Sequence, residues 1–243
     1  IKVGFIHGVM NTDNTSISCE TIDYGPCAFM DAYKSDKVFS SIDSMGRYCY
    51  KNQPNIIMWN MACFASTLIP LIGENTERNT KILQDEISKI PEMYKNKWLE
   101  EFSLKLGFDK NLPEDETLIN EFLNILETEE LDFTNSFRSL LTESKTISKS
   151  IKFKEWDQKW KKRLEEEANK AKTKEILNLN NPAFIIRNHL IEDIIKDLLN
   201  DKKDFLNKIL FCIEKPYEKI SNYNEMYVKP NKNQEVTETF CGT

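Results

Sequence analysis

Several residue types and patterns that mark common classes of site are missing from this sequence. It has only seven glycines in 243 residues, with no G-x-G-x-x-G loop to cover phosphates and no V-A-I-K segment to supply a nucleotide-binding lysine. Its two histidines and six cysteines include no C-x-x-C pair, which argues against a zinc site. We expect the cysteines to be reduced thiols, because disulfides are rare in cytosolic proteins.

Excess positive charge and long apolar runs are also missing. The formal net charge is −6, which argues against non-specific binding to nucleic acid or to an anionic membrane. The longest apolar run, residues 56–72, is broken by polar residues and by Pro70, so we expect no helix that spans a membrane. The chain begins at Ile1 within a strand-like run, and we expect a further segment to precede it.

The candidate metal-site residues lie in two short segments of the first 26 residues. The segment HGVMNTDN (residues 7–14) follows an apolar run, and the segment IDYGP (residues 22–26) lies shortly after it. Asn and Asp residues at the ends of short strands can converge on one point, and their oxygens are ligands that Mg²⁺ prefers. This pattern predicts a metal site that contains Asn14 and Asp23.

The spacing of these residues is similar to that of the catalytic loop of protein kinases. In that loop H-R-D-x-x-x-x-N is followed by D-F-G, and the Asn and the D-F-G Asp hold the metal ions. His7 precedes Asn14 by seven positions, and Asp23 begins D-Y-G. Val9 occupies the position of the kinase base. Asp13 is therefore either a base that orients or deprotonates an attacking hydroxyl, or a carboxylate that supports the metal ligands.

A closer resemblance rests on HGVMNTDN, TIDYGP, GRY (residues 46–48), and NQP (residues 52–54) with a following W-N. Together these segments resemble the selenoprotein O family of protein adenylyltransferases, which have a pseudokinase fold. Sparser similarity continues to a cysteine three residues from the end of the sequence.

The resemblance implies a mainly α fold: a protein-kinase-like C-lobe with a small strand-and-loop catalytic corner at its N-terminus, and with the N-lobe absent from this chain. Residues 1–243 would form one lobe. Its implied parts are catalytic and metal-binding loops at 1–35, an activation-segment-like loop at 36–53, a helical body at 54–215 and an irregular tail at 216–243.

The resemblance also implies a reaction, in which AMP is transferred from ATP to Ser, Thr or Tyr hydroxyls of protein substrates. The implied cofactor is Mg²⁺ or Mn²⁺, with Asp13 catalytic and with Asn14 and Asp23 binding metal and nucleotide. The phosphate clamp would lie in the missing N-terminal lobe, in cis or as another chain. We therefore predict that this chain alone is inactive. Family members occur in the bacterial cytoplasm and in mitochondria.

Residue types indicate supporting roles in this corner, and the same resemblance implies a regulatory one. His7, Gly8 and Gly25 are expected to hold the loops in shape. Cys241 is a possible redox residue, because in some members the corresponding residue bridges to a cysteine of the activation segment. That partner position is Phe39 here, which departs from the family pattern.

Two other functions remain open. The same metal site could serve ordinary phosphoryl transfer, because the absent lobe sets the orientation of the nucleotide. Alternatively, the chain is a non-catalytic pseudokinase interaction module that keeps the metal residues for structural reasons. A large exposed apolar patch around residues 1–6 would favour that reading.

Apolar periodicity predicts seven or eight helices after residue 53. Gln53-Pro54 opens the first, at about 55–71, and its nearly continuous apolar surface predicts deep burial. Residues 143–150 read as a polar linker. The other stripes lie at 76–90, 93–106, 118–126, 133–141, 151–172, 185–199 and 203–213.

A few side chains outside the corner are assigned to structure. Trp156 and Trp160, at i and i+4, are predicted to pack in a core. Arg47 and Arg187 are predicted to pair with internal carboxylates or to anchor a loop, and His189 is predicted to be a hydrogen-bonded core histidine.

Overall fold

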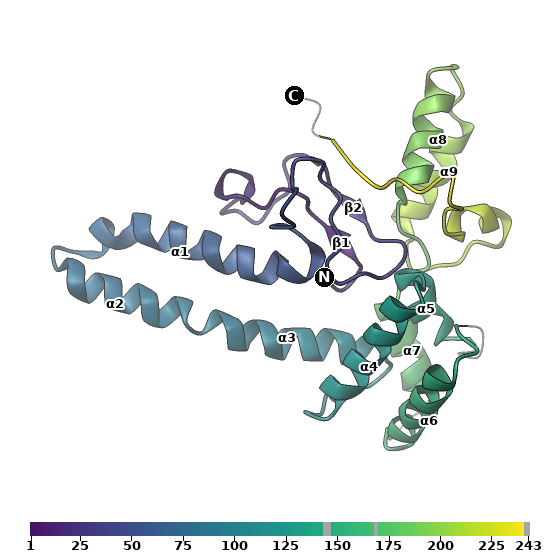
Figure 1. Cartoon of the computed structure of the whole chain (residues 1–243), viewed down its shortest axis with the longest axis horizontal. Helices are drawn as coiled ribbons and strands as arrows, with labels where there is room; N and C mark the ends of the chain where they lie inside the picture. Colours follow the sequence, from purple (N-terminus) through teal and green to yellow (C-terminus); the bar gives the residue numbers. More distant parts are fainter. Residues whose placement is uncertain (143–146, 168–169, 241–243) are drawn as a thin grey trace.

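The computed structural model describes residues 1–142, 147–167 and 170–240. In this part of the chain the fold is mainly α, with nine α-helices and a two-stranded sheet near the N-terminus (Figure 1). The strands are β1 (Phe5–Ile6) and β2 (Ala28–Phe29). The helices are α1 (Gln53–Ile72), α2 (Thr76–Ile87), α3 (Ile90–Lys105), α4 (Asp115–Thr128), α5 (Phe133–Ser139), α6 (Ile151–Glu165), α7 (Lys170–Asn180), α8 (Asn188–Leu198) and α9 (Asp204–Glu214).

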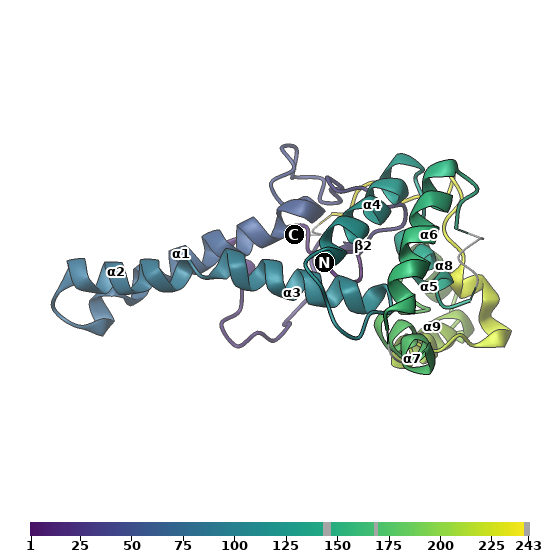
Figure 2. The ribbon, with the colours of Figure 1, turned by 90° about the horizontal axis from the view of Figure 1, so that it is seen from below.

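Helices α1, α2 and α3 form an arm that extends from one side of the body (Figures 1 and 2). Pro54 lies in the first turn of α1, where its missing N–H costs nothing. At the tip, the Asn79 side chain donates hydrogen bonds to the carbonyls of Ile69 (3.0 Å) and Gly73 (2.8 Å), and Asn75 caps α2. These bonds close the turn that sends α2 and α3 back along α1.

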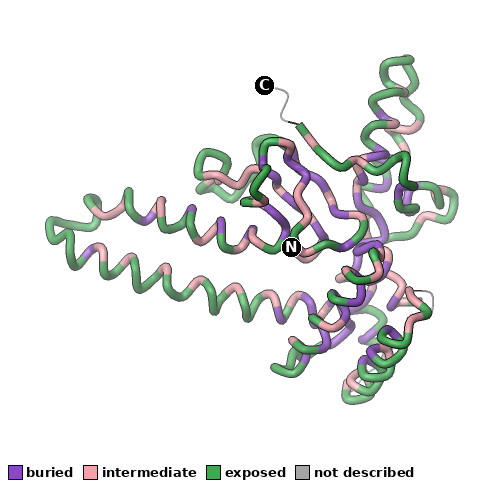
Figure 3. Tube along the Cα trace, viewed as in Figure 1, coloured by how far each residue is buried: buried purple, intermediate pink, exposed green. Residues whose placement is uncertain are grey.

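The predicted bounds of α1 agree with the structure within two residues, but its predicted deep burial is wrong. Only four of its twenty residues are buried: Gln53, Ile56, Asn60 and Ala65. Two of these four are polar. Figure 3 shows the arm as mostly exposed or intermediate. The physical reason is that α1 packs mainly against α2, while much of its remaining surface is exposed in the described chain.

The expectation about membrane spans also changes. With the 3₁₀ turn that precedes α1, the helical segment Tyr50–Ile72 has 23 residues, which is long and apolar enough to cross a membrane by length and composition. Pro70 and the isolated polar residues do not interrupt it, since α1 continues to Ile72.

The main core lies where α3, α4, α5 and α6 meet. Trp156 stacks on Phe122 at 4.2 Å between ring centroids and on Trp160 at 5.7 Å. The indole N–H of Trp156 donates to the Leu118 carbonyl, and that of Trp160 donates to the Leu106 carbonyl, both at 2.8 Å. The predicted packing role of both tryptophans is confirmed.

One predicted helix begins in the wrong place. The segment after Asn181-Pro182 is extended until α8 begins at Asn188. Tertiary hydrogen bonds replace the helical ones there, because the backbone N–H groups of Ala183 and Phe184 both donate to the Pro216 carbonyl, at 2.7 and 2.9 Å. Beyond α9 the tail contains a 3₁₀ segment, Ser221–Tyr227, and is otherwise irregular.

Arg187 ties the N-terminal corner to the helical body. Its guanidinium, 2% exposed, pairs with Asp31 just after β2 and with Asp132, the N-cap of α5, at 2.7 Å. Asp132 also accepts the backbone N–H of Asn135 at 2.7 Å. The structural role predicted for Arg187 is confirmed. His189 is buried as predicted, but its Nδ1 has no hydrogen-bond partner in the described part of the chain.

Candidate functional site

The candidate residues lie on one long loop that joins β1 to β2. The two strands pair antiparallel, with Phe5 opposite Phe29 and Ile6 opposite Ala28. Just beyond the pairing, Gly8 has φ +91°, and a Cβ added there would lie 2.5 Å from the Pro26 carbonyl oxygen. Only glycine permits this approach. The two ends of the loop are therefore held against each other, at Gly8 and at Pro26.

Asn14 ends a 3₁₀ turn, Thr12–Asn14. The side chain of Asn11 accepts the Asn14 backbone N–H at 3.0 Å. The Asn14 side-chain amide donates from Nδ2 to the Val9 carbonyl at 3.0 Å. This bond uses Nδ2 within the loop, while Asn14 as a residue is exposed and its Oδ1 makes no hydrogen bond in the described part of the chain.

Asp13 and Asp23 are both exposed. Within the described ranges, neither carboxylate makes an ion pair or a side-chain hydrogen bond. The charge of Asp23 acts on His7: burial lowers the pKa of His7, and the negative charge of Asp23 partly offsets that shift. His7 is therefore neutral at pH 7, and its Nδ1 accepts the Val9 N–H at 3.4 Å.

Helix α1 supports this loop through two polar side chains. Gln53 donates to the Phe5 carbonyl at 3.0 Å and accepts the His7 backbone N–H at 2.9 Å. Asn60 donates to the Met10 carbonyl at 2.9 Å and to the Thr15 hydroxyl at 2.7 Å. No role was assigned to Gln53 or Asn60 from the sequence. The available signal was their position as the Q of NQP and the N of W-N.

The C-terminal tail contacts the same corner at Thr239. Its hydroxyl donates to the Pro26 carbonyl at 2.6 Å, and its backbone N–H donates to the Phe39 carbonyl at 2.7 Å. In return, the Ser41 N–H donates to the Thr239 carbonyl at 3.0 Å. Thr239 thus joins the D-Y-G-P segment to the loop at 36–53, a contact that the sequence did not indicate.

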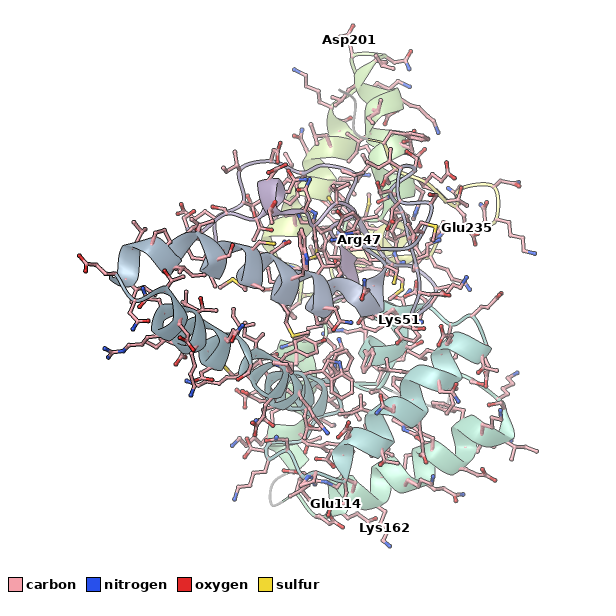
Figure 4. All side chains as sticks on the ribbon, turned by 60° about the vertical axis from the view of Figure 1, so that its left-hand side comes forward. Arg47, Lys51, Glu114, Lys162, Asp201 and Glu235 are labelled. Atoms are coloured by element: carbon pink, nitrogen blue, oxygen red, sulfur yellow. The ribbon has the colours of Figure 1, made fainter. Side chains whose placement is uncertain are left out.

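Other predicted residues have different outcomes. Gly25 has no positive φ, and a Cβ there would meet nothing within 4 Å, so the expected need for glycine holds at Gly8 and not at Gly25. Arg47 lies over the Trp59 ring of α1 at 5.0 Å rather than against a carboxylate, and Figure 4 shows Arg47 near the end of α1 that joins the body. Cys241 lies outside the described residues.

The corner offers few ligands to a metal ion. In the described segments, no group of three or more His, Cys, Asp or Glu side chains is placed to hold one. Asn14 and Asp23 would supply two oxygens. Mg²⁺ commonly takes one or two protein carboxylates, with water and substrate phosphates completing its octahedron, so this donor set fits a magnesium–nucleotide site rather than a metal cage made of protein alone.

Comparison with known proteins agrees with the motifs. A family model described as protein adenylyltransferase SelO matches residues 1–214. The chain belongs to this family. The resemblance inferred from HGVMNTDN and TIDYGP is thereby confirmed, and the SelO match extends from the corner through α9.

Curated SelO-family relatives place the chain within a longer protein. It is 44% identical over 246 residues to the protein nucleotidyltransferase YdiU of Bacillus cereus strain AH820, and it is equally similar to those of Bacillus anthracis and Bacillus thuringiensis subsp. konkukian. Each alignment covers 99% of this chain and 50% of the relative. The chain therefore spans about half the length of these relatives.

Proposed function

We propose that this chain is the kinase-like C-lobe half of a protein adenylyltransferase and supplies the metal-binding and acceptor-activating side of its active site. One observation carries the proposal: in the loop that matches the SelO family, Asp13, Asn14 and Asp23 are exposed, and Gln53 and Asn60 of α1 hold this corner by hydrogen bonds. We expect this exposed corner to form one side of the nucleotide site, and a further polypeptide segment to form the other side.

The reaction is the attack of a protein hydroxyl on the α-phosphorus of ATP. A new bond forms between that oxygen and phosphorus, the bond to the bridging oxygen breaks, and pyrophosphate leaves. Asp13 orients the hydroxyl and accepts its proton. Asn14 and Asp23 would hold Mg²⁺ or Mn²⁺, which neutralises developing phosphate charge. His7, neutral and bonded to Val9, keeps the loop in place.

The described residues contain a base candidate and two metal ligands but no phosphate clamp. This kind of catalysis depends mostly on positioning the reactants and neutralising charge, so half of the site should accelerate the reaction very little. Residues 1–243 alone are therefore predicted to transfer no AMP. Turnover by the purified chain with ATP, metal and an acceptor protein would contradict this.

The test uses the complete protein that contains this chain, with ATP labelled at the α- or γ-phosphate. Transfer of the α-label to protein is expected, and Asp23→Ala or Asn14→Ala should reduce it by about 10²–10³-fold, as for other groups that stabilise transition-state charge. Glu20→Ala is the matched control, because Glu20 is an exposed carboxylate on the same loop. Transfer of the γ-label would establish phosphoryl transfer instead. Full activity of Asp23→Ala would leave the corner a purely structural role.

A further inference from the structure

Helix α1 has a composition that its exposure does not explain. Its twenty residues, Gln53–Ile72, include no charged side chain. Among its exposed positions, 55, 59, 62, 66 and 70 recur at three- and four-residue intervals, so these five share one face. That face consists of Asn, Trp, Ala, Ser and Pro, and Trp59 on it is 48% exposed. We call these five residues the outer face of α1.

The neighbouring helix shows what a water-facing helix in this chain looks like. Helix α2 is more exposed than α1, and its twelve residues include Glu77, Arg78, Lys81, Asp85 and Glu86. Charged side chains are the usual composition of a solvent-facing helix surface. The outer face of α1 has none, although it lies on the same arm. This contrast indicates that another surface covers α1 but not α2.

The outer face is next to the candidate site. Asn60, one residue from Trp59, bonds to the carbonyl of Met10 and to Thr15, within the loop that carries Asp13 and Asn14. Trp59 itself packs under Arg47 of the activation-segment-like loop. Whatever covers α1 would therefore lie close to the loop that carries Asp13 and Asn14.

We propose that the outer face of α1 is the binding surface for the other half of the protein. This other half is the polypeptide that SelO-family relatives have beyond the part spanned by residues 1–243. Two facts favour this occupant: the chain covers only 50% of those relatives, and α1 bonds directly to the loop that forms one side of the proposed nucleotide site. The proposal rests on the proposed function only for the statement that the other half supplies the residues that bind the ATP phosphates.

A membrane is the less favourable occupant. Charged residues near the centre of a bilayer cost about 2.5–3.5 kcal/mol each on insertion scales. Helix α2 runs alongside α1 and would bring several of them into the hydrocarbon region. The exposed Asp13 would also approach it. A protein surface over one face of α1 avoids these costs.

The first experiment places a photo-crosslinking amino acid at Ala62, the small residue in the middle of the outer face, in the complete purified protein. Crosslinks are expected from Ala62 to peptides of the same polypeptide outside residues 1–243. The control position is Ile151, which is 74% exposed at the start of α6 and outside the arm, and it should give no such crosslinks. Crosslinks only to a second copy, only within residues 1–243, or none at all would overturn the proposal.

A second measurement compares Ala62→Asp in two contexts. In residues 1–243 alone the new carboxylate is exposed, and the Tm should not change. In the complete protein it would be buried without a partner, and a fall of several degrees in Tm is expected. Ile151→Asp should change neither. Equal changes in Tm in both contexts would refute the proposed binding surface. Binding of residues 1–243 to vesicles of phosphatidylcholine and phosphatidylglycerol through this face would also refute it. None of these readouts needs AMP transfer, so the proposed function can fail independently.

Discussion

Arg187 is the residue whose surroundings matter most for joining the corner to the body. Burial alone would lower its pKa, but the carboxylates of Asp132 and Asp31 raise it above the ordinary value. Burial raises the pKa of Asp31, and Arg187 opposes that shift. A guanidinium can bond to two carboxylates in fixed geometry, which an ammonium cannot. The three charges therefore depend on one another.

Arg187→Ala is predicted to destabilise the fold by about 3–5 kcal/mol, because two carboxylates would be left without their cation. Arg187→Lys should recover only part of this, since Lys lacks the planar fork. The free energy of unfolding in urea measures both variants. A loss below about 1 kcal/mol for Arg187→Ala would mean that water solvates Asp31 and Asp132 well enough without it.

Lys105, at the end of α3, is 1% exposed, and its ammonium lies over the rings of Phe137 (4.2 Å) and Phe133 (5.4 Å). Cation–π contact contributes about 2 kcal/mol when desolvated, whereas removing an ammonium from water costs several. The second effect is larger, so burial holds the pKa of Lys105 well below 10.5.

The sign for stability follows from this shift. In the unfolded chain Lys105 takes up its proton near pH 10.5, whereas in the folded protein it does so only at lower pH. Lys105 therefore destabilises the fold least above pH 10.5. As the pH falls from 10.5 toward the lower pKa of the folded state, the free energy of unfolding decreases. Lys105→Met should therefore stabilise the protein at pH 7, on the order of 1–2 kcal/mol. Urea unfolding at pH 7, 8 and 9 measures this, and the gain should shrink as pH rises. A gain independent of pH would point to packing rather than charge.

Sequence reasoning at the residue level worked where a local motif exists. Helical periodicity identified Trp156 and Trp160 as core residues, and the motifs around Asn14 and Asp23 identified the family, while the metal-binding role of those two residues stays a prediction. The roles of Gln53, Asn60 and Thr239 were not identified, because their partners lie 46 or more, 45 or more and up to 213 residues away in sequence. No spacing rule connects such positions before the chain is folded.

Among the elements, the β1–β2 loop depends on a single close approach of backbone. Gly8→Ala is predicted to cost about 1–3 kcal/mol from its positive φ alone. Contact with the Pro26 carbonyl adds to this and should separate the two ends of the loop. Gly25→Ala is the matched control on the same loop, and it should stay within about 0.5 kcal/mol of the parent, because its added Cβ meets nothing. Thermal unfolding distinguishes the two variants. An equal loss of stability in both would show that the backbone at Pro26 moves to accommodate the new Cβ.

Helix α1 shows why the existence of an element is easier to predict than its surroundings. Gln53-Pro54 and the apolar run placed it to within two residues of Gln53–Ile72. Its lack of charge was read as burial within this chain. Apolar composition indicates that a surface avoids water, but it does not say which chain covers it. Residues 1–6 are buried or intermediate, so the exposed patch that would have favoured a non-catalytic interaction module is not present there.

Across the whole molecule, the tail is predicted to control the order of the corner through Thr239. Thr239→Val removes one hydroxyl bond to Pro26, worth about 0.5–1.5 kcal/mol. Hydrogen exchange at the Ser41 amide, which donates to the Thr239 carbonyl, should become faster, and Thr239→Ser should restore it. Thr237→Val is the control, because Thr237 is exposed. Unchanged exchange at Ser41 would show that the tail is held by other contacts.

The Pro26–Thr239 bond spans 213 residues and has a consequence for synthesis. Translation proceeds at about 5–20 residues per second, so the hairpin loop leaves the ribosome roughly 10–40 s before the residue that fastens it. During that interval Asp13, Asn14 and Asp23 belong to a nascent chain whose corner is still unfastened. Synthesis of Thr239 is thus required before this contact can form, and a chain terminated before Thr239 would carry Asp13, Asn14 and Asp23 without it.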